Sequence, residues 1–395
     1  MRFATITERL EGLGADKWAV HFRGRDLAAE GRDIIELTIG EPDIPPHEGL
    51  VEATVAALRA GRTRYSGGHG EVGLREAIAA RYTARAGRAV HPDQVLCLPG
   101  TQSALYVAMA ALAEAGDEVA IPDPYYATYE GVVRASGATV LPVPTRPEDG
   151  FRLTPEALAA ALTPATRVLL LNSPRNPTGS VMSPDDVAAI TRLCATRGIW
   201  IISDEVYEEL IFDPEARFAS PFDLAEGAEI TVVVSSISKS HAAPGFRSGW
   251  MVSSDRIRRR AQPVAEMMLF GNQPFIADGT EYALTHHDPS AGIMRENFAR
   301  RARLAFDLLT GPGLAPLMPQ AGMFLFCGIA GTGQDSDAFA AGLLEAEGVA
   351  TMPGSAFGSC GTRHLRLSLT VPDERLTEAC RRIRRHAASL AARVA

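Results

Sequence analysis

The sequence predicts an α/β protein with a mostly parallel sheet covered by helices, and a smaller α+β domain beside it. Short apolar segments alternate with longer amphipathic ones across the middle of the chain, as in repeated βαβ units. Three segments, VLLLN, IWIIS and TVVVS, are continuously hydrophobic, which is typical of strands buried on both faces. At 395 residues the chain is also too long for one simple core, so two domains are expected.

The expected elements follow one another in βαβ order. Strands are predicted over 95–98, 118–121, 139–142, 168–172, 199–203, 231–235 and 248–252. Helices are predicted between them over 103–115, 126–135, 155–162 and 184–197. Together these elements predict a large domain over residues 45–285.

Past residue 286 the pattern changes to short strands mixed with helices. The predicted elements are a long charged helix over 290–309, a strand over MFLF, a helix over 336–347, two strands around VATMPG and HLRLSL, and a final helix from residue 373. This mixture predicts the smaller α+β domain over residues 286–395. Residues 1–44 are expected to join it, because LTIGEPD is typical of a segment that crosses between domains.

Composition and charge exclude several classes of function. The chain has 39 basic and 47 acidic residues, a net charge of −8, so neither a nucleic acid nor an anionic membrane is an expected partner. No apolar run approaches the ~18 residues of a membrane span, and the first residues, MRFATITERL, lack the apolar segment of a signal peptide. The five cysteines are scattered without a CxxC pair, which favours reduced thiols in the cytoplasm over disulfides or a metal site.

Lysine is nearly absent from the chain. Of the 39 lysine and arginine residues, only Lys17 and Lys239 are lysine. A guanidinium stays protonated, whereas an amine can lose its proton and form a Schiff base, so a lysine in this arginine-rich chain is a candidate for amine chemistry. Lys239 follows the buried segment TVVVS and is the stronger candidate. Lys17 lies in a polar segment, where it could equally have persisted by chance.

One glycine-containing turn is predicted to bind phosphate, and another is not. Gly100, Thr101 and Gln102 follow a strand and open an apolar helix, where backbone N–H groups, a hydroxyl and the helix dipole can hold an anion; an ordinary helix cap is the alternative. Residues 68–73, GHGEVG, match the dinucleotide pattern GxGxxG. They follow RTRYSG rather than an apolar strand, so they are expected to be turn glycines.

Two polar motifs leave the carboxyl ends of predicted parallel strands. The first is NSPRNPTG, residues 172–179, and the second is DEVY, with Asp204 and Tyr207. Open α/β sheets bind ligands at this edge. Turn chemistry accounts for half of the first motif, and a helix N-cap is the alternative for Asp204.

The motif after TVVVS combines an amine with groups that bind anions. In SISKSHAAPGFR, Ser236, Ser238 and Lys239 come first, and Arg247 follows eight residues after the lysine. A guanidinium is a strong ligand of a phosphate dianion. Together with the turn at residues 100–102, this motif predicts an amine beside a phosphate site.

These motifs, in this order and at these separations, resemble those of fold-type I, pyridoxal-phosphate-dependent aminotransferases of the aspartate aminotransferase superfamily. The resemblance runs from GEPD near residue 40 to HLRLSL near residue 365. It implies that Lys239 forms the Schiff base with pyridoxal 5′-phosphate and moves a proton between the substrate Cα and the cofactor. It also implies that Asp204 pairs with the protonated pyridine nitrogen, while Tyr207 and Asn176 bind the phenolic oxygen.

The resemblance implies roles for further residues. The implied cofactor ligands at the phosphate end are Gly100, Thr101, Gln102, Ser236, Ser238 and Arg247. Tyr126 in DPYYATYE would stack on the pyridine ring, and Tyr65 in RYSGG would reach the phosphate of a neighbouring subunit, so a homodimer is expected. Arg366 would bind the substrate α-carboxylate as a bidentate fork, with Asn176 and the backbone N–H of Gly40 beside it. No metal is expected.

Segments outside these motifs indicate a substrate. SKSHAAPGFRSGW, EMMLFGNQPFIAD, AGMFLF and PGSAFG resemble the arginine–pyruvate transaminase branch, which implies amino transfer from arginine, or a broad set of L-amino acids, to pyruvate. Glu11, Asp16 and Glu71 are acidic candidates for binding a basic donor, with solvated surface acids as the alternative. Many aspartate-specific relatives have a lysine in the segment that is GTQSAL here. An aspartate or aromatic aminotransferase, and a β-lyase with the same cofactor and fold, remain the alternative functions.

Overall fold

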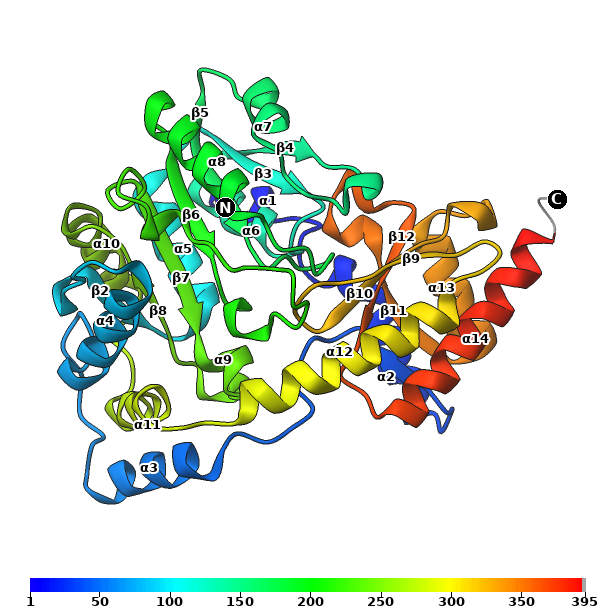
Figure 1. Ribbon diagram of the computed structural model, residues 1–395, viewed down its shortest axis with the longest axis horizontal. Coiled ribbons are helices and arrows are strands. Elements are labelled where there is room, and N and C mark those ends of the chain that lie inside the picture. Colours follow the sequence, from blue (N-terminus) through cyan, green and yellow to red (C-terminus); the bar gives the residue numbers. More distant parts are fainter. Residues whose placement is uncertain (393–395) are drawn as a thin grey trace.

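Two β-sheets form the framework of the computed structural model, which describes residues 1–392 (Figure 1). The larger sheet has seven strands in the order β2-β8-β7-β6-β5-β3-β4. They are β2 (Val95–Leu98), β3 (Glu118–Asp123), β4 (Thr139–Pro144), β5 (Thr166–Asn172), β6 (Trp200–Asp204), β7 (Thr231–Ser236) and β8 (Gly249–Val252). Strands β4, β3, β5, β6 and β7 are parallel, and β8 is antiparallel to β2 and β7. The predicted α/β class with a mostly parallel sheet is confirmed.

Helices cover both faces of this sheet, which explains its continuously apolar strands. They are α4 (Val72–Ala86), α5 (Gly100–Leu112), α6 (Tyr129–Ser136), α7 (Pro155–Ala161), α8 (Pro184–Arg197), α10 (Asp255–Met268) and α11 (Pro274–Thr285), and α3 (Glu48–Arg59) packs on α11. Val232 and Val234 of β7 pack in the core shared with α5 and α10, whereas Val233 packs in the core shared with α4 and α11. Since successive side chains of a strand point to opposite faces, every position needs an apolar residue.

The smaller sheet is formed by one strand from the N-terminal part of the chain and by strands from its C-terminal part. Its order is β1-β11-β12-β10-β9, with β1 parallel to β11 and the other pairs antiparallel. The strands are β1 (Ile35–Leu37), β9 (Ala315–Leu317), β10 (Phe324–Gly328), β11 (Val349–Pro353) and β12 (His364–Ser368). Helices α2 (Ala19–Ala29), α12 (Ser290–Leu309), α13 (Ser336–Glu347) and α14 (Asp373–Ala391) lie around it, and α1 (Thr5–Arg9) contacts α6 instead. The division into residues 45–285 and 1–44 plus 286–395 agrees with the two sheets and stays a prediction.

The predicted elements differ from the structure at helix starts and in several helices that the sequence analysis does not predict, of which α3, α4, α10 and α11 belong to the predicted larger domain. Helix α5 begins three residues before the predicted start, because Gly100 turns the chain at a φ of +80°, a conformation that favours glycine. Helices α3, α4, α10 and α11 lie outside the predicted elements. Helix α10 contains Pro263, a residue that interrupts helical sequence patterns.

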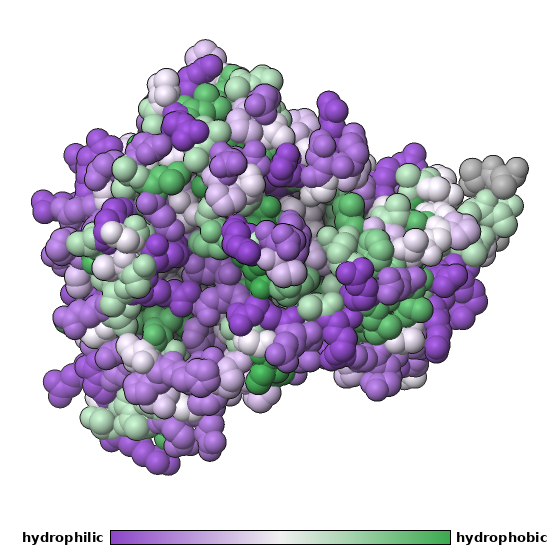
Figure 2. All heavy atoms as spheres, viewed as in Figure 1, coloured by the Kyte–Doolittle hydropathy of each residue, from purple (hydrophilic) through white to green (hydrophobic). Residues whose placement is uncertain are grey.

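Three general properties of the described chain bear on function. Within residues 1–392, no helix is long and apolar enough to cross a membrane. The same residues contain no group of three or more His, Cys, Asp or Glu side chains placed to hold a metal ion. Figure 2 shows a mostly hydrophilic surface on this face, with hydrophobic residues in small separate patches.

Candidate active site

The carboxyl ends of β5, β6 and β7 place polar residues at one edge of the larger sheet. Asn172 ends β5, Asp204 ends β6 and Ser236 ends β7, and the strand register pairs Asn172 with Asp204. A cavity of about 200 Å³ lies at this edge, and the smaller sheet contributes Phe324 and Arg366 to its wall. The cavity therefore has the position in which open α/β sheets bind ligands.

Most of the predicted site residues line this cavity. They are Gly40, Thr101, Gln102, Tyr126, Asn176, Asp204, Tyr207, Ser236, Ser238, Lys239, Arg247 and Arg366. Gly100 lies beside them, next to the guanidinium of Arg247. Tyr65 does not line the cavity of its own chain: it is 86% exposed and packs against Phe270.

Asp204 is a buried carboxylate held by two hydrogen bonds. Its Oδ2 accepts a bond from the Tyr129 hydroxyl at 2.8 Å, and its Oδ1 accepts one from the backbone N–H of Val206 at 3.2 Å. Burial raises the pKa of Asp204 from 3.8 to about 6, although both bonds and the Lys239 ammonium act to lower it. The short 3₁₀ helix that follows, Glu208–Leu210, has Tyr207 at its N-cap position, so Asp204 is not that helix's cap.

Lys239 lies on the short helix α9 (Ile237–Ser240), directly after β7. Its Nζ donates a hydrogen bond of 2.5 Å to the carbonyl oxygen of Gly40. Burial lowers the pKa of this amine to about 8, and the guanidinium groups of Arg366 and Arg247 act in the same direction. An amine with this pKa is neutral in an appreciable fraction of molecules near pH 7, as a nucleophile or base must be.

The other lysine connects two segments beside the cavity. Lys17 Nζ donates to a carboxylate oxygen of Glu130 at 2.9 Å and to the carbonyl oxygen of Ala127 at 3.3 Å. The neighbouring Trp18 lines the cavity. Lys17 therefore anchors the segment that carries Trp18 to the chain around the start of α6.

One corner of the cavity is built to receive an anion. Thr101 Oγ1 donates to Ser236 Oγ at 2.9 Å, and Ser236 Oγ accepts from the backbone N–H of Ser238 at 3.3 Å. A Cβ on Gly100 would lie 2.2 Å from Arg247 Nη2, so only glycine lets the guanidinium approach the start of α5. That helix has no side-chain cap, which leaves its first N–H groups free to bind an anion.

Arg366 is a buried cation at the opposite wall. It is 1% exposed; Nη1 donates to Asn176 Oδ1 at 3.1 Å, Nη2 donates to the carbonyl oxygen of Thr38, and Nε has no partner. Its guanidinium carbon lies 4.1 Å from the ring centre of Phe324 and 4.7 Å from that of Phe357. Burial lowers the pKa of Arg366 to about 10. An anionic ligand would compensate this buried charge.

Gly40 and two tyrosines complete the walls. A Cβ on Gly40 would lie 2.1 Å from Phe324 Cζ, so glycine is required for the backbone to pass this ring and reach Lys239. Tyr126 and Tyr207 both line the cavity. Burial raises the pKa of both phenols, so each hydroxyl remains a hydrogen-bond donor throughout the neutral range.

Eight residues to which the sequence analysis gives no individual role also line the cavity, and four of them have polar or aromatic side chains. Tyr129, Asn172, Trp18 and Phe324 line the cavity. Tyr129 lies three residues after Tyr126, and that spacing is the signal that could have suggested it. Asn172 ends the predicted strand VLLLN; its Nδ2 donates to the carbonyl oxygen of Asp204 at 3.0 Å and its Oδ1 accepts from the backbone N–H of Asn176 at 2.8 Å.

The three acidic candidates and the GxGxxG match lie outside the cavity. Glu11 and Asp16 are exposed, and Glu71 forms an ion pair of 2.5 Å with Arg62. Gly68 and Gly70 lie in the turn before α4, where Gly70 has a φ of +97°, and Gly73 lies in the first turn of α4. These positions agree with the interpretation of the three acidic residues as surface acids and of the GxGxxG match as glycines near a turn.

The cavity fits pyridoxal 5′-phosphate in three respects. It holds an amine with a lowered pKa, a buried carboxylate, and a corner of hydroxyls, guanidinium and free N–H groups that suits a phosphate. Lys239 would hold the aldehyde carbon, Asp204 the ring nitrogen, and Thr101, Ser236 and Arg247 the phosphate. A separate buried guanidinium with an unpartnered Nε, that of Arg366, remains for a second anion.

Comparisons with known proteins agree with this chemistry. The family model described as aminotransferase class I and II matches residues 32–383. Arginine–pyruvate transaminase AruH of Pseudomonas aeruginosa is 42% identical over 391 residues, which cover 99% of each chain. Aspartate/prephenate aminotransferase of Thermus thermophilus is 33% identical and covers 93% of this chain and 94% of its own.

Solved structures show the same fold. The aspartate aminotransferase of Thermus thermophilus with maleate has a TM-score of 0.91 at 32% identity, covering 98% of this chain and 100% of its own. The aromatic aminotransferase of Pyrococcus horikoshii OT3 has a TM-score of 0.87 at 33% identity, covering 92% and 98%. The family, fold and enzyme class expected from the sequence are thus confirmed, and the chain belongs to the class I and II aminotransferases, which depend on pyridoxal 5′-phosphate.

Proposed function

We propose that the protein transfers the amino group of arginine, or of a broad set of L-amino acids, to pyruvate. One observation favours an amino donor other than aspartate. Among the described residues that line the cavity, the cationic side chains are Lys239, Arg247 and Arg366, and each has a proposed partner in the cofactor or the α-carboxylate. No cation in that lining remains for the second carboxylate of aspartate. The 42% identity to a protein named arginine–pyruvate transaminase supports this choice.

Substrate binding is proposed to begin at Arg366. The substrate α-carboxylate would accept from the unpartnered Nε and from Nη2, the nitrogen on the same edge of the guanidinium, forming a bidentate fork while Nη1 keeps its contact with Asn176. Trp18, Ile39 and Phe324 form an apolar part of the lining. This surface suits the alkyl portion of a long donor side chain.

Lys239 is proposed to move the reacting proton. Pyridoxal 5′-phosphate, when bound, supplies an electron sink for the charge left at the substrate Cα. The Lys239 amine, whose pKa is lowered to about 8 by burial, is basic enough to take the Cα proton and acidic enough to return it. Asp204 is proposed to keep the ring nitrogen protonated, and Tyr207 and Asn176 to bind the phenolic oxygen.

A panel of donors and acceptors tests the proposed substrate. Purified protein with cofactor is assayed with L-arginine, L-alanine, L-phenylalanine and L-aspartate, each with pyruvate and with 2-oxoglutarate, and both products are identified. The expected result is a higher kcat/KM for arginine and pyruvate than for aspartate and 2-oxoglutarate. Preference for aspartate would overturn the donor assignment, and release of a side-chain fragment instead of a 2-oxo acid would indicate a β-lyase.

We also propose a homodimer in which Tyr65 completes the partner's phosphate site. Tyr65, Phe270 and Met267 are 86%, 72% and 85% exposed, and Ser66 Oγ and both side-chain polar atoms of Asn272 are buried without a partner. Exposed large apolar side chains grouped in this way favour an interface. The five free cysteines support a further proposal, a location in the reducing cytoplasm.

Mixing two inactive variants tests the shared site. Lys239→Ala and Tyr65→Ala chains are unfolded and refolded together, so that one site of each mixed dimer has both native residues. The expected activity is roughly a quarter of wild type, because half of the dimers are mixed and one of their two sites is intact. A mixture no more active than either variant alone, with mixed dimers present, would overturn the role of Tyr65.

A further inference from the structure

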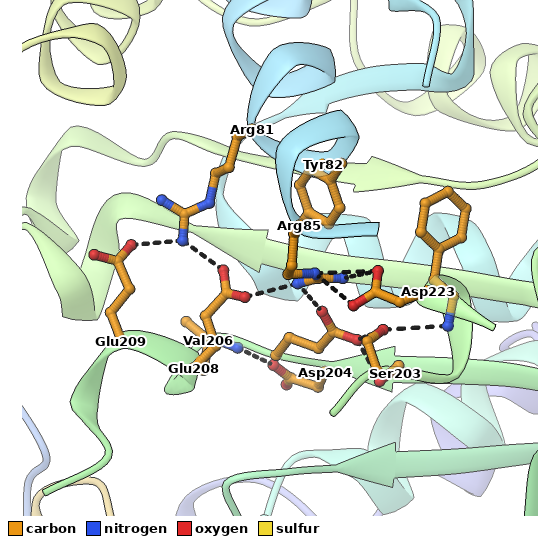
Figure 3. A network of polar contacts seen from close by, with 12 residues as sticks. Arg81, Tyr82, Arg85, Ser203, Asp204, Val206, Glu208, Glu209 and Asp223 are labelled. Atoms are coloured by element: carbon orange, nitrogen blue, oxygen red, sulfur yellow. Dashed lines mark hydrogen bonds and ion pairs between the residues drawn. The ribbon is translucent and has the colours of Figure 1, made fainter. Parts of the chain in front are cut away.

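A network of charged side chains lies behind the segment that carries Asp204 and Tyr207 (Figure 3). Asp204 and Tyr207 line the cavity. Glu205 and Glu208, which alternate with them in the sequence, bind a guanidinium of α4 instead. The same short segment thus presents two side chains to the cavity and two to the helix behind it.

Arg85 of α4 joins three carboxylates. Its Nη1 donates to Glu205 Oε2 at 2.8 Å and to Glu208 Oε2 at 2.7 Å. Its Nε lies 2.9 Å from Asp223 Oδ2, and its guanidinium carbon lies 4.6 Å from the centre of the Tyr82 ring. A planar fork of five N–H donors allows these contacts at once, which an ammonium group does not.

Arg81 extends the network by one helical turn. Residues four apart lie on the same face of a helix, so Arg81 points in the same direction as Arg85 (Figure 3). Its Nη2 lies 2.7 Å from Glu208 Oε1 and 2.7 Å from Glu209 Oε1. Two arginines therefore face four carboxylates, including that of Asp223.

Glu205 is fixed on several sides. It is 1% exposed; its Oε1 accepts bonds from Ser203 at 2.9 Å and Ser220 at 2.5 Å, and its backbone N–H donates to the carbonyl oxygen of Val234 at 3.0 Å. Burial raises the pKa of Glu205 to about 7, and Arg85 acts to lower it. The guanidinium, together with the hydrogen bond from Ser220, favours the charged form of a carboxylate held in the protein interior.

We propose that Arg85 is a positioning residue, which orients Asp204 and Tyr207 toward the cofactor by fixing Glu205 and Glu208. Residues 205–207 lie between the end of β6 and the following 3₁₀ helix, and their described backbone bonds include that of Glu205 to Val234 and that of the Glu208 N–H to the Glu205 carbonyl oxygen. The guanidinium of Arg85 binds the side chains at positions 205 and 208 and thereby fixes the turn between them. The proposal rests on the proposed roles of Asp204 and Tyr207.

The test measures cofactor binding as well as activity. Arg85→Met, Arg85→Lys and Glu205→Gln are compared with Arg258→Met, a control that removes another buried arginine. Arg258 is 6% exposed, donates to Asp255, Gln262 and the carbonyl oxygen of Asp93, and is not among the residues that line the cavity. Five quantities are measured: the Kd of pyridoxal 5′-phosphate for the cofactor-free protein, the pH midpoint of the bound cofactor's visible band, kcat, KM and the melting temperature.

A positioning role predicts a specific combination of results. Arg85→Met weakens cofactor binding by about 10-fold, as the loss of outer-shell partners does at metal sites, and lowers kcat by about 100-fold, as small misplacements do. The pH midpoint of the bound cofactor's visible band also moves. KM for the donor changes little, because Arg366 is not altered. Arg85→Lys restores part of the loss, and Arg258→Met changes only the melting temperature.

Other outcomes overturn the proposal. If the folded Arg85 and Glu205 variants keep the wild-type Kd and pH midpoint and lose only thermal stability, the network is merely structural. If Arg85→Met does not fold, the Kd and the pH midpoint of Arg85→Lys and Glu205→Gln decide between a positioning role and a merely structural one. Failure of the wild-type protein to bind the cofactor would instead refute the proposed function, so the two failures are distinguishable.

Discussion

Replacing Asp204 by asparagine separates the charge of this residue from its hydrogen bonds. An amide of nearly the same size can still accept from the Val206 N–H, and its NH₂ group can donate to the Tyr129 hydroxyl, which now accepts. The fold should therefore survive. A neutral amide cannot keep a pyridine nitrogen protonated, so we expect kcat to fall by about 10²–10³-fold, or about 3–4 kcal/mol of transition-state stabilisation.

The same substitution should stabilise the cofactor-free protein at neutral pH. Burial raises the pKa of Asp204 from 3.8 to about 6, so the native state retains a proton that the unfolded chain has already lost. Native stability therefore falls as pH rises from about 4 to about 6 and stays lower above that range. At 1.36 kcal/mol for each pKa unit, the ionised carboxylate costs about 3 kcal/mol. Asparagine does not have this cost.

The assay compares the two proteins without cofactor by denaturant unfolding between pH 4 and pH 8. The difference in the free energy of unfolding should be small near pH 4 and should grow to about 3 kcal/mol above pH 6, in favour of Asp204→Asn. Turnover is measured on the same preparations after the cofactor is added. Near-normal turnover would remove Asp204 from the catalytic residues, and a variant less stable at pH 8 would refute the reasoning from burial.

Three further substitutions probe the remaining groups. Lys239→Arg keeps the positive charge but cannot form a Schiff base, so the visible absorbance of lysine-bound cofactor and the turnover should both be lost; a variant that retains both would contradict the assignment. Arg366→Lys replaces the fork with a single ammonium, and KM for the donor should rise about 10-fold or more, since one hydrogen bond to a charged group contributes about 1.5–3 kcal/mol; an unchanged KM would place the carboxylate elsewhere. Tyr129→Phe removes a bond that lowers the pKa of Asp204, so the acidic limb of the pH–rate profile should move to higher pH, whereas a shift to lower pH would contradict this electrostatic role.

Local sequence patterns predict the elements that position the site. The segments VLLLN and TVVVS are buried on both faces, and this burial leaves few alternatives to a central strand of a covered sheet. Asn172, the last residue of VLLLN, and Ser236, which directly follows TVVVS, therefore lie at one edge, as expected. Lys239 was identifiable for a different reason: in a chain that uses arginine almost everywhere, an amine at the end of a buried strand is a chemical signal.

Contacts between distant segments could not be predicted in the same way. The Tyr129 hydroxyl reaches Asp204 across 75 positions of sequence, and Arg85 reaches Glu205 across 120. Neither pair follows from the period of a helix or strand, because each depends on how two helices pack on the sheet. The abundance of arginine also hides Arg85, since one arginine on an amphipathic helix is ordinarily a solvated residue.

The position of Arg366 suggests why the cavity needs both sheets. Arg366 lies on β12 of the smaller sheet, while Asn176, which accepts its Nη1 bond, follows β5 of the larger one. Lys239 is linked to the N-terminal segment in the same manner, through the carbonyl oxygen of Gly40. The α-carboxylate proposed to bind at Arg366 and the amine proposed to react near Lys239 would therefore be positioned by contacts that cross between the sheets. Substrate geometry at Cα then depends on how the two sheets are held together, and not on either one alone.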